Sequence, residues 1–279
     1  MLLLVVEGIV IGFLLGLTGA GGGILAVPAL MTSQGWSVAQ AAPIGLLAVA
    51  LSTLIGTIEG LFKKIVRYRA AIWIALIGAP MAHIGILIAN TISPIWLMLM
   101  FSLVMFTVGY RLISNRISDF HNPPCQVNPS TGRFIWNFKT GGVLASIGII
   151  AGLLTGMLGV GGGFVIVPAL RKVTNLDMHS IVATSLMIIF LISGMSIVMH
   201  IAEGFHYPVA ITSAFALACA FGMLLGRRAI RFIPSAIVQK VFALMVFAVA
   251  IYMVTLYTTN FTEPLSYQGS AFLKLPKFP

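Results

Sequence analysis

Two glycine-rich segments of the chain have the composition and spacing of a binding site for an anion. Residues 12–30 and 152–170 align without gaps at an offset of 140, with 11 of 19 positions identical, and each contains GxGGG followed by VPAL. Consecutive glycines destabilise a helix by about 1 kcal/mol each relative to alanine. We therefore expect a helix break in each segment, so that residues 24–30 and 164–170 start new helices. Their free N–H groups would lie at the positive end of a helix dipole.

The candidate ligands at these breaks are backbone N–H groups and neighbouring hydroxyls, which cost less to bury than charged groups do. The predicted substrate-binding residues are Thr18, Gly19, Gly21, Gly22, Gly23, Gly159, Gly161, Gly162, Gly163, Thr184 and Ser185. Thr155 precedes the second break as Thr18 precedes the first, and Thr53 pairs with Ser193 at the same offset. Two alternatives stay open: the glycines can serve only close helix packing, and each hydroxyl can simply bond the preceding turn of its own helix.

Three ionisable side chains are candidates for proton coupling. His83 lies well inside an apolar segment, and histidine is the side chain that ordinarily changes charge near physiological pH. A hydrogen-bonded packing role is the alternative for it. Glu59 and Glu203 occupy equivalent ends of the second apolar segment in each half, where they are either gates or solvated helix ends.

The elements that carry these residues are predicted to be membrane-spanning helices. The 279 residues are 59% hydrophobic and only 8% charged, with a mean hydropathy of +1.07, whereas soluble domains are roughly a quarter charged. Apolar runs of about 20 residues recur along the chain, which is the length that crosses the hydrocarbon core of a bilayer. The alternating pattern of a membrane β-barrel is absent from the sequence. The fold class is therefore an all-α polytopic membrane protein.

Each half of the chain is predicted to contain a glycine-broken helix pair and three full spans, which puts eight to ten helices in the membrane. The first repeat is 1–114, a polar linker is 115–139, the second repeat is 140–258, and 259–279 is an irregular tail. The expected helices are 3–18, 22–33, 37–62, 70–89 and 94–114 in the first repeat, and 140–157, 162–173, 177–203, 207–227 and 234–258 in the second.

Basic residues predict the orientation of these spans. They cluster after the span predicted at 37–62, in the linker, near 171 and at 227–231, whereas the connections near 34–37, 90–94 and 204–206 carry no Lys or Arg. Since basic loops stay in the cytoplasm, the linker is cytoplasmic and the two halves have opposite orientations. Each broken pair is then either two short tilted spans or a re-entrant hairpin. Inverted repeats with interrupted helices are typical of secondary transporters.

Several other classes of function have little support in the sequence. A formal net charge of +10 does not indicate nucleic-acid binding, because the basic residues fall in short clusters between apolar runs. Cys125 and Cys219 form neither a disulfide framework nor a metal-ligand spacing, and no nucleotide-binding motif follows the glycines. The apolar segments contain no nucleophile–base pair. We expect no metal, no cofactor and no enzymatic activity.

The two segments GLTGAGGGILAVPAL and GMLGVGGGFVIVPAL resemble the TauE/SafE family of sulfite and organosulfonate exporters, also called the 4-toluene sulfonate uptake permease family. The similarity covers nearly the whole chain and transfers by residue onto the two glycine motifs with Pro28 and Pro168. It implies transport of small sulfur oxyanions or sulfonates, such as sulfite, sulfoacetate or taurine-derived species, coupled to an ion gradient. The second half has Thr184 and Ser185 near the start of a span, whereas Gly45 stands in the first half, where a hydroxyl is missing.

The hypothesis is therefore a secondary transporter that moves a small sulfur anion across the bilayer of a bacterial inner membrane by alternating access. It uses no nucleic acid, and a homodimer is one option for its assembly. The alternatives are a passive anion channel, a transporter of another small organic anion, and a subunit of a larger membrane assembly.

Overall fold

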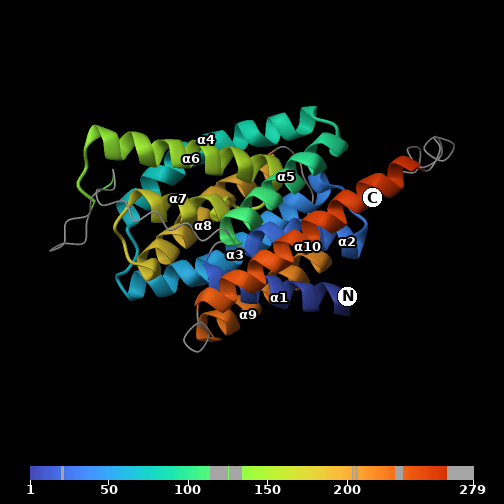
Figure 1. Ribbon diagram of the computed structural model, residues 1–279, viewed down its shortest axis with the longest axis horizontal. Helices are drawn as coiled ribbons and strands as arrows, with labels where there is room; N and C mark the ends of the chain where they lie inside the picture. Colours follow the sequence, from blue (N-terminus) through green and yellow to red (C-terminus); the bar gives the residue numbers. More distant parts are fainter. Residues whose placement is uncertain are drawn as a thin grey trace.

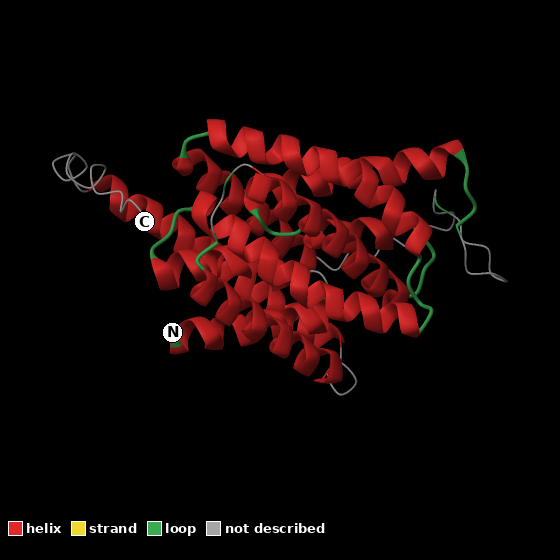
Figure 2. Cartoon of the chain, turned by 180° about the vertical axis from the view of Figure 1, so that it is seen from behind, coloured by secondary structure: helices red, strands yellow, loops and turns green. Residues whose placement is uncertain are grey.

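The protein is a bundle of helices arranged side by side (Figure 1). The computed structural model describes residues 1–19, 22–113, 125, 134–202, 204, 207–229 and 235–262. The elements in chain order are α1 (Leu2–Thr18), a 3-10 helix η1 (Gly22–Leu25), α2 (Ala26–Gln34), α3 (Val38–Phe62), α4 (Tyr68–Thr91), α5 (Pro94–Ile113), α6 (Phe138–Leu158), α7 (Gly163–Val173), α8 (Met178–Ala202), α9 (Val209–Ala229) and α10 (Ser235–Thr262). Within the described ranges, loops and turns are short connections between helices (Figure 2).

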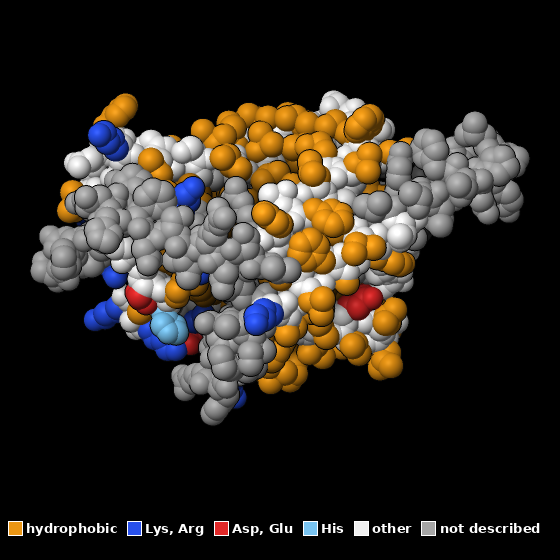
Figure 3. All heavy atoms as spheres, in the orientation of Figure 1, with side chains coloured by type: hydrophobic (Ala, Val, Ile, Leu, Met, Phe, Trp, Pro, Cys, Tyr) orange, Lys and Arg blue, Asp and Glu red, His pale blue; other side chains and the backbone are white. Residues whose placement is uncertain are grey.

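The ten helices confirm the predicted all-α class and lie close to the predicted segments. By length and composition, α3, α4, α6, α8 and α9 are long and apolar enough to cross a membrane, and the described parts of α1, α5 and α10 contain shorter apolar stretches. Large apolar side chains in the middle of outer helices are exposed, for example Leu103, Leu217 and Leu244, at 67%, 68% and 71%. Figure 3 shows hydrophobic side chains over much of the described surface in the centre and right of that view. The chain is a multi-pass membrane protein.

Glycines bring two pairs of helices into backbone contact. Three glycines four residues apart lie on one face of α1, which packs along α9, and three more lie on one face of α6, which packs along α4. They are Gly8, Gly12 and Gly16 on α1 and Gly148, Gly152 and Gly156 on α6. A Cβ added at Gly12 would collide with the carbonyl of Cys219, and one at Gly156 with the carbonyl of Ala82. Small residues allow this close approach in membranes, where no hydrophobic force drives helices together.

The centre of the bundle is formed by α3 and α8. These two helices pack on each other, α3 also packs on α9, α8 also packs on α4, and α5 and α10 form a further pair. Along α8, Ile181, Leu186, Ile188 and Ile192 are fully or almost fully buried. The central position of α3 and α8 makes them the elements against which the glycine breaks lie.

Basic residues of the described segments gather at one end of the bundle, which we call the basic end. It contains the end of α3 with the turn to α4, the start of α6, and the ends of α7 and α9 (Figure 1). They are the described Lys and Arg side chains apart from Lys240 in α10: Lys63, Lys64, Arg67, Arg69, Lys139, Arg171, Lys172, Arg227 and Arg228. The visible Lys and Arg atoms lie toward the same side in Figure 3, whereas Met1 and the end of α2 lie at the opposite end in Figure 1.

Asp177 caps the start of α8 at the basic end. Its carboxylate accepts the N–H of Ser180 at 3.3 Å. Burial alone raises the pKa of Asp177, but hydrogen bonds from Ser180 and the nearby His179 outweigh it, so the pKa lies below its ordinary value. Such a carboxylate stabilises the fold above its unfolded-state pKa, and this contribution is lost as the pH falls through the folded-state pKa.

We therefore expect Asp177→Ala to lower the free energy of unfolding by about 1 kcal/mol at neutral pH. The difference from the wild type should shrink in acid, because the wild-type carboxyl is then protonated too. Thermal unfolding of both proteins in detergent at neutral and acidic pH measures this. A difference that is the same at both pH values would contradict the capping role.

Candidate anion-binding site at the glycine breaks

The first helix of each broken pair ends on a glycine in the same conformation. Gly19 ends α1 with φ 73°, and Gly159 ends α6 with φ 71°. The N–H of Gly19 donates to the carbonyl of Leu15 at 2.8 Å, and the N–H of Gly159 donates to that of Thr155 at 2.9 Å. Glycine is favoured at this left-handed position because it has no Cβ. The predicted breaks are therefore present and end the helices at equivalent residues.

After each break the chain turns back along the helix it has just left. A Cβ added to Gly22 would lie 2.6 Å from the carbonyl oxygen of Ile11 on α1, and one added to Gly162 would lie 2.7 Å from that of Ala151 on α6. These two contacts are related by the offset of 140. At 9 and 11 residues, α2 and α7 are about half as long as a helix that crosses the bilayer.

Contacts at the far ends of α2 and α7 also fit hairpins. The hydroxyl of Ser33 in α2 lies within hydrogen-bonding reach of Glu7, near the start of α1. Cys125 interacts with Thr140 at the start of α6, and its N–H donates to the carbonyl of Val173 at the end of α7 at 3.0 Å. In each glycine-broken pair the second helix thus folds back along the first. The choice between two short spans and a re-entrant hairpin stays a prediction.

The two breaks meet between α3 and α8. A Cβ at Gly23 would lie 2.7 Å from the carbonyl oxygen of Val160, and the side chain of Val49 on α3 lies next to both Gly23 and Gly161. On the α8 side, a Cβ at Gly161 would lie 3.0 Å from Ile189 and 3.4 Å from the Oγ of Ser193. The starts of the two half-helices therefore converge in the buried centre of the bundle.

Ser193 is the polar side chain that stands out at this centre. It is fully buried, and its Oγ has no hydrogen-bond partner among the residues that the structure describes. Its counterpart Thr53 is also fully buried, but the Thr53 hydroxyl bonds the carbonyl of Val49 at 2.7 Å. A buried hydroxyl without a partner is costly, so Ser193 is suited to bind a ligand that arrives from outside the protein.

Ser185 also lies at a break. Its buried hydroxyl donates to the carbonyl of Val182 at 2.8 Å and approaches that of Gly19 at 3.4 Å. In the first half, Gly45 lies near the carbonyl of Gly159, at 3.6 Å from an added Cβ. The first break therefore has a hydroxyl beside it, that of Ser185, whereas the equivalent position beside the second break is Gly45, which has none. The sequence predicts this difference between the two halves.

The other two predicted hydroxyl ligands, Thr18 and Thr184, have partners within the protein, as does Thr155 before the second break. The hydroxyls of Thr18 and Thr155 bond the carbonyls of Leu14 and Ala151, at 2.8 and 2.6 Å. Thr184 accepts the backbone N–H of Arg67 at 3.0 Å, so its hydroxyl is directed to the turn between α3 and α4. These side chains help to position the helices around the breaks.

The predicted proton-coupling residues lie away from the breaks or outside the described residues. Glu59, at the end of α3, forms an ion pair with Lys63 and accepts the Nε–H of Arg227 on α9 at 2.8 Å. His83 lies partly buried on α4, next to Ala82, which contacts Gly156. Glu203 and the predicted ligand Gly21 lie outside the residues that the structure describes.

The polar groups found next to the described break glycines are backbone groups and hydroxyls. The three atoms nearest to the added Cβ of each described break glycine include none from an Asp, Glu, Lys or Arg. The described part of the chain also contains no group of three metal-ligating side chains. Unbonded N–H groups at the start of a helix attract negative charge. The arrangement can therefore hold a small anion with neutral donors, which bind it without an opposite charge.

Sequence reasoning did not include Ser193 among the predicted ligands. The signal was its pairing with Thr53 at the offset of 140, but the pairing does not reveal which hydroxyl is bonded to its own helix. The Gly8–Gly12–Gly16 and Gly148–Gly152–Gly156 stripes were also not singled out, although their four-residue spacing is visible in the sequence.

The fold and its paired, broken helices define a polytopic α-helical membrane protein, and comparison with known proteins gives its family. Residues 4–253 match the family described as Sulfite exporter TauE/SafE. The chain belongs to this family, which is one of membrane transporters rather than enzymes.

Its relatives include proteins described as probable membrane transporter proteins. Those of Xylella fastidiosa strains Temecula1 and 9a5c are 31% and 32% identical over 253 and 252 residues, which is 89% of this chain and 92% of each relative. YunE of Bacillus subtilis strain 168 is 26% identical over 215 residues, 72% of this chain and 78% of its own. No solved structure matches the chain.

Proposed function

We propose that the protein is a secondary transporter that moves a small sulfur oxyanion or sulfonate by alternating access and binds it at the two glycine breaks. The observation that carries the proposal is the convergence of both half-helix starts on a buried hydroxyl, that of Ser193, which has no partner in the described part of the chain. Sulfite and sulfonates such as sulfoacetate are the proposed substrates, because the family is described as one of sulfite exporters.

The packing supports an inverted repeat. The repeat relates α1 to α6, α3 to α8 and α4 to α9. The contact of α1 with α9 therefore corresponds to that of α6 with α4, and the contact of α3 with α9 to that of α8 with α4. All four contacts are present. Gly19 contacts Val182, and Gly159 contacts Ala42 in the equivalent way. We infer that repeats 1–114 and 140–258 are related by a pseudo-two-fold axis and that each contributes one hairpin and three crossings.

The basic end supports an orientation in which the linker 115–139 lies in the cytoplasm of a bacterial cell, since Lys and Arg accumulate on that side of an inner membrane. The first hairpin would then open from the outside and the second from the cytoplasm. Rocking of one repeat against the other would expose the breaks to each side in turn.

We propose that the second repeat makes most of the polar contacts to the anion. Ser193 and Ser185 lie on α8, whereas Thr53 is bonded within α3 and Gly45 has no hydroxyl. Neutral hydroxyl and N–H donors hold an anion without the full charge pairing that would slow its release. The ion pair of Glu59 with Arg227 is a candidate gate at the basic end. Proton coupling through His83, Glu59 or Glu203 stays a prediction, and so does assembly as a homodimer.

Transport of radiolabelled sulfite by purified protein in proteoliposomes tests this function. We expect saturable uptake by the wild type and a KM at least about tenfold higher for Ser193→Ala, because a hydrogen bond to a charged group contributes roughly 1.5–3 kcal/mol. Thr53→Val is the matched control, since the Thr53 hydroxyl already bonds its own helix. Its KM should stay within about twofold of the wild type.

The outcomes separate the possibilities. No saturable flux of sulfite, sulfoacetate or another sulfonate would refute the substrate class. Equal KM values for the wild type and Ser193→Ala would refute the role of Ser193. Single-channel currents without any gradient coupling would indicate a passive channel instead of a transporter.

A further inference from the structure

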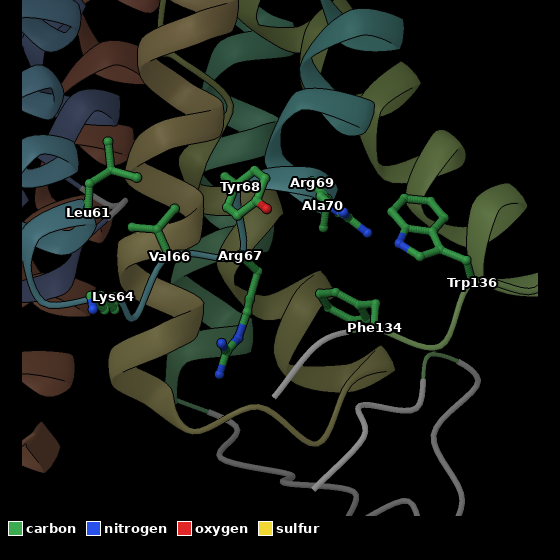
Figure 4. A pocket seen from close by; sticks show the side chains of 9 residues that line it. All are labelled: Leu61, Lys64, Val66, Arg67, Tyr68, Arg69, Ala70, Phe134 and Trp136. Atoms are coloured by element: carbon green, nitrogen blue, oxygen red, sulfur yellow. The ribbon is translucent and has the colours of Figure 1, made fainter. Parts of the chain in front are cut away.

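A cavity of about 520 Å³ lies at the basic end, at the turn between α3 and α4 (Figure 4). Three cationic side chains, those of Lys64, Arg67 and Arg69, line it together with three aromatic ones, those of Tyr68, Phe134 and Trp136. In Figure 4, Arg69 extends toward Trp136, whereas Arg67 points to the opposite side of Phe134. The central breaks include none of these residues, so the cavity is a separate feature.

The charge in this cavity is unbalanced. None of its nine lining residues is an Asp or a Glu. The Nε of Arg67 is buried and has no hydrogen-bond partner in the part of the chain that the structure describes. A buried guanidinium N–H without an acceptor is costly, and three neighbouring cations repel one another. An anion with several oxygen atoms would satisfy the free donor and neutralise the charge.

The backbone adds to this positive potential. Helix α4 begins at Tyr68, and no side chain caps its N-terminus. Tyr68, Arg69 and Ala70 form its first turn and line the cavity. The first N–H groups of a helix have no partner within it and lie at the positive end of its dipole. The start of this 24-residue helix therefore reinforces the three cationic side chains.

Lys64 has an unusual backbone conformation for a lysine. Its φ is 55°, in the left-handed region, and its N–H donates to the carbonyl of Leu61 at 3.0 Å while that of Ile65 donates to Gly60 at 3.2 Å. Glycine is the usual residue at this position of a helix C-terminus. Strained residues of this kind often occur at binding sites, and the side chain of Lys64 lines the cavity.

Aromatic side chains place the cavity at the level of the lipid headgroups. Trp73 and Trp136 are 39% and 41% exposed, and their rings pack edge to face with centroids 6.1 Å apart. The indole N–H of Trp73 donates to the carbonyl of Gly141 at 3.2 Å. Exposed Trp and Tyr gather at the membrane–water interface, and basic pockets between helix ends bind anionic headgroups.

We propose that this cavity binds the phosphate headgroup of an anionic phospholipid. The phosphate oxygens would accept from the Nε–H of Arg67 and the start of α4. Arg69 and Lys64 would contribute charge, and the aromatic rings would pack on the glycerol and upper acyl region. A dissolved oxyanion has the same charge chemistry, but it would leave the aromatic wall of the cavity unused. The proposal does not depend on which anion the protein transports.

Native mass spectrometry of the purified full-length protein with phosphatidylglycerol or phosphatidylcholine tests the proposal. The variant Lys64→Gln/Arg67→Gln/Arg69→Gln removes the cations of the cavity. The matched control Arg171→Gln/Lys172→Gln/Arg228→Gln removes the same charge from the same end, at residues that do not line the cavity. With roughly a fivefold contribution from each basic side chain, we expect the apparent Kd for phosphatidylglycerol to rise about 100-fold in the cavity variant.

The control should bind phosphatidylglycerol as the wild type does, and phosphatidylcholine should bind weakly to all three proteins. Arg69→Gln alone, which leaves the turn and Arg67 intact, should weaken binding about fivefold even if the triple variant fails to fold. Equal affinity of the wild type and Arg69→Gln overturns the proposal, as does an equal loss in the control. Displacement of the lipid by inorganic phosphate of similar affinity would show that the ligand comes from solution and would overturn the lipid assignment.

Discussion

Replacement of Gly162 by alanine is expected to reduce the flux of sulfite in proteoliposomes at least tenfold. Gly162 precedes α7 with φ 64°, and a Cβ there would lie 2.7 Å from both the carbonyl oxygen of Ala151 and the Oγ of Thr155. The left-handed conformation alone costs a non-glycine residue about 1 kcal/mol or more, and the collision with α6 adds to this. To relieve the backbone strain and the collision, the start of α7 must move away from the proposed anion. The measurement is the flux of sulfite.

Gly22→Ala should have a similar effect on flux, because its Cβ would lie 2.6 Å from the carbonyl oxygen of Ile11. Gly194→Ala is the matched control: Gly194 lies on α8 next to Ser193, and nothing lies within 4 Å of an added Cβ. Size-exclusion chromatography shows whether each variant stays monodisperse. Undiminished flux in monodisperse Gly162→Ala and Gly22→Ala protein would contradict a site at the half-helix starts.

Replacement of Gly156 by alanine is expected to destabilise the protein by about 2–3 kcal/mol. Gly156 lies on the face of α6 that packs along α4, and a Cβ there would overlap the carbonyl group of Ala82. A backbone carbonyl cannot rotate away as a side chain can, so the two helices must move apart along their contact. A lower melting temperature in detergent, followed by circular dichroism, is the measurement.

The control for this prediction lies on the same helix. Gly142 is exposed, and nothing lies within 4 Å of its added Cβ. Gly142→Ala should therefore leave the melting temperature unchanged or raise it, since alanine favours a helix over glycine by up to about 1 kcal/mol. If Gly156→Ala were as stable as Gly142→Ala, the close contact between α4 and α6 would not contribute to stability.

The helices were predictable because their signals are local. Most helix ends predicted from apolar length, glycines at the breaks and polar residues lie within three residues of the observed ends. For example, the helix predicted at 177–203 is α8, Met178–Ala202. The internal repeat was also visible, and the equivalent contacts of Gly22 and Gly162 follow it. An apolar run of about 20 residues surrounded by lipid has few alternatives to a helix.

The details of the candidate site depend on which way each side chain faces, and neighbouring helices decide that. Thr184 and Ser185 are adjacent in sequence, yet the first bonds the turn before α4 and the second approaches Gly19. Thr53 and Ser193 are equivalent in the repeat, yet only the Thr53 hydroxyl is bonded to its own helix. Serine and threonine hydroxyls choose between local and tertiary acceptors, so spacing alone does not rank them.

A density map of the protein saturated with a sulfonate substrate would show directly whether the anion binds at the glycine breaks. We expect density for the sulfonate group between Gly23 and Gly161, with an oxygen within hydrogen-bonding distance of the Oγ of Ser193. Substrate density elsewhere in the bundle, with the breaks closed on each other and Ser193 without contact to it, would contradict the claim.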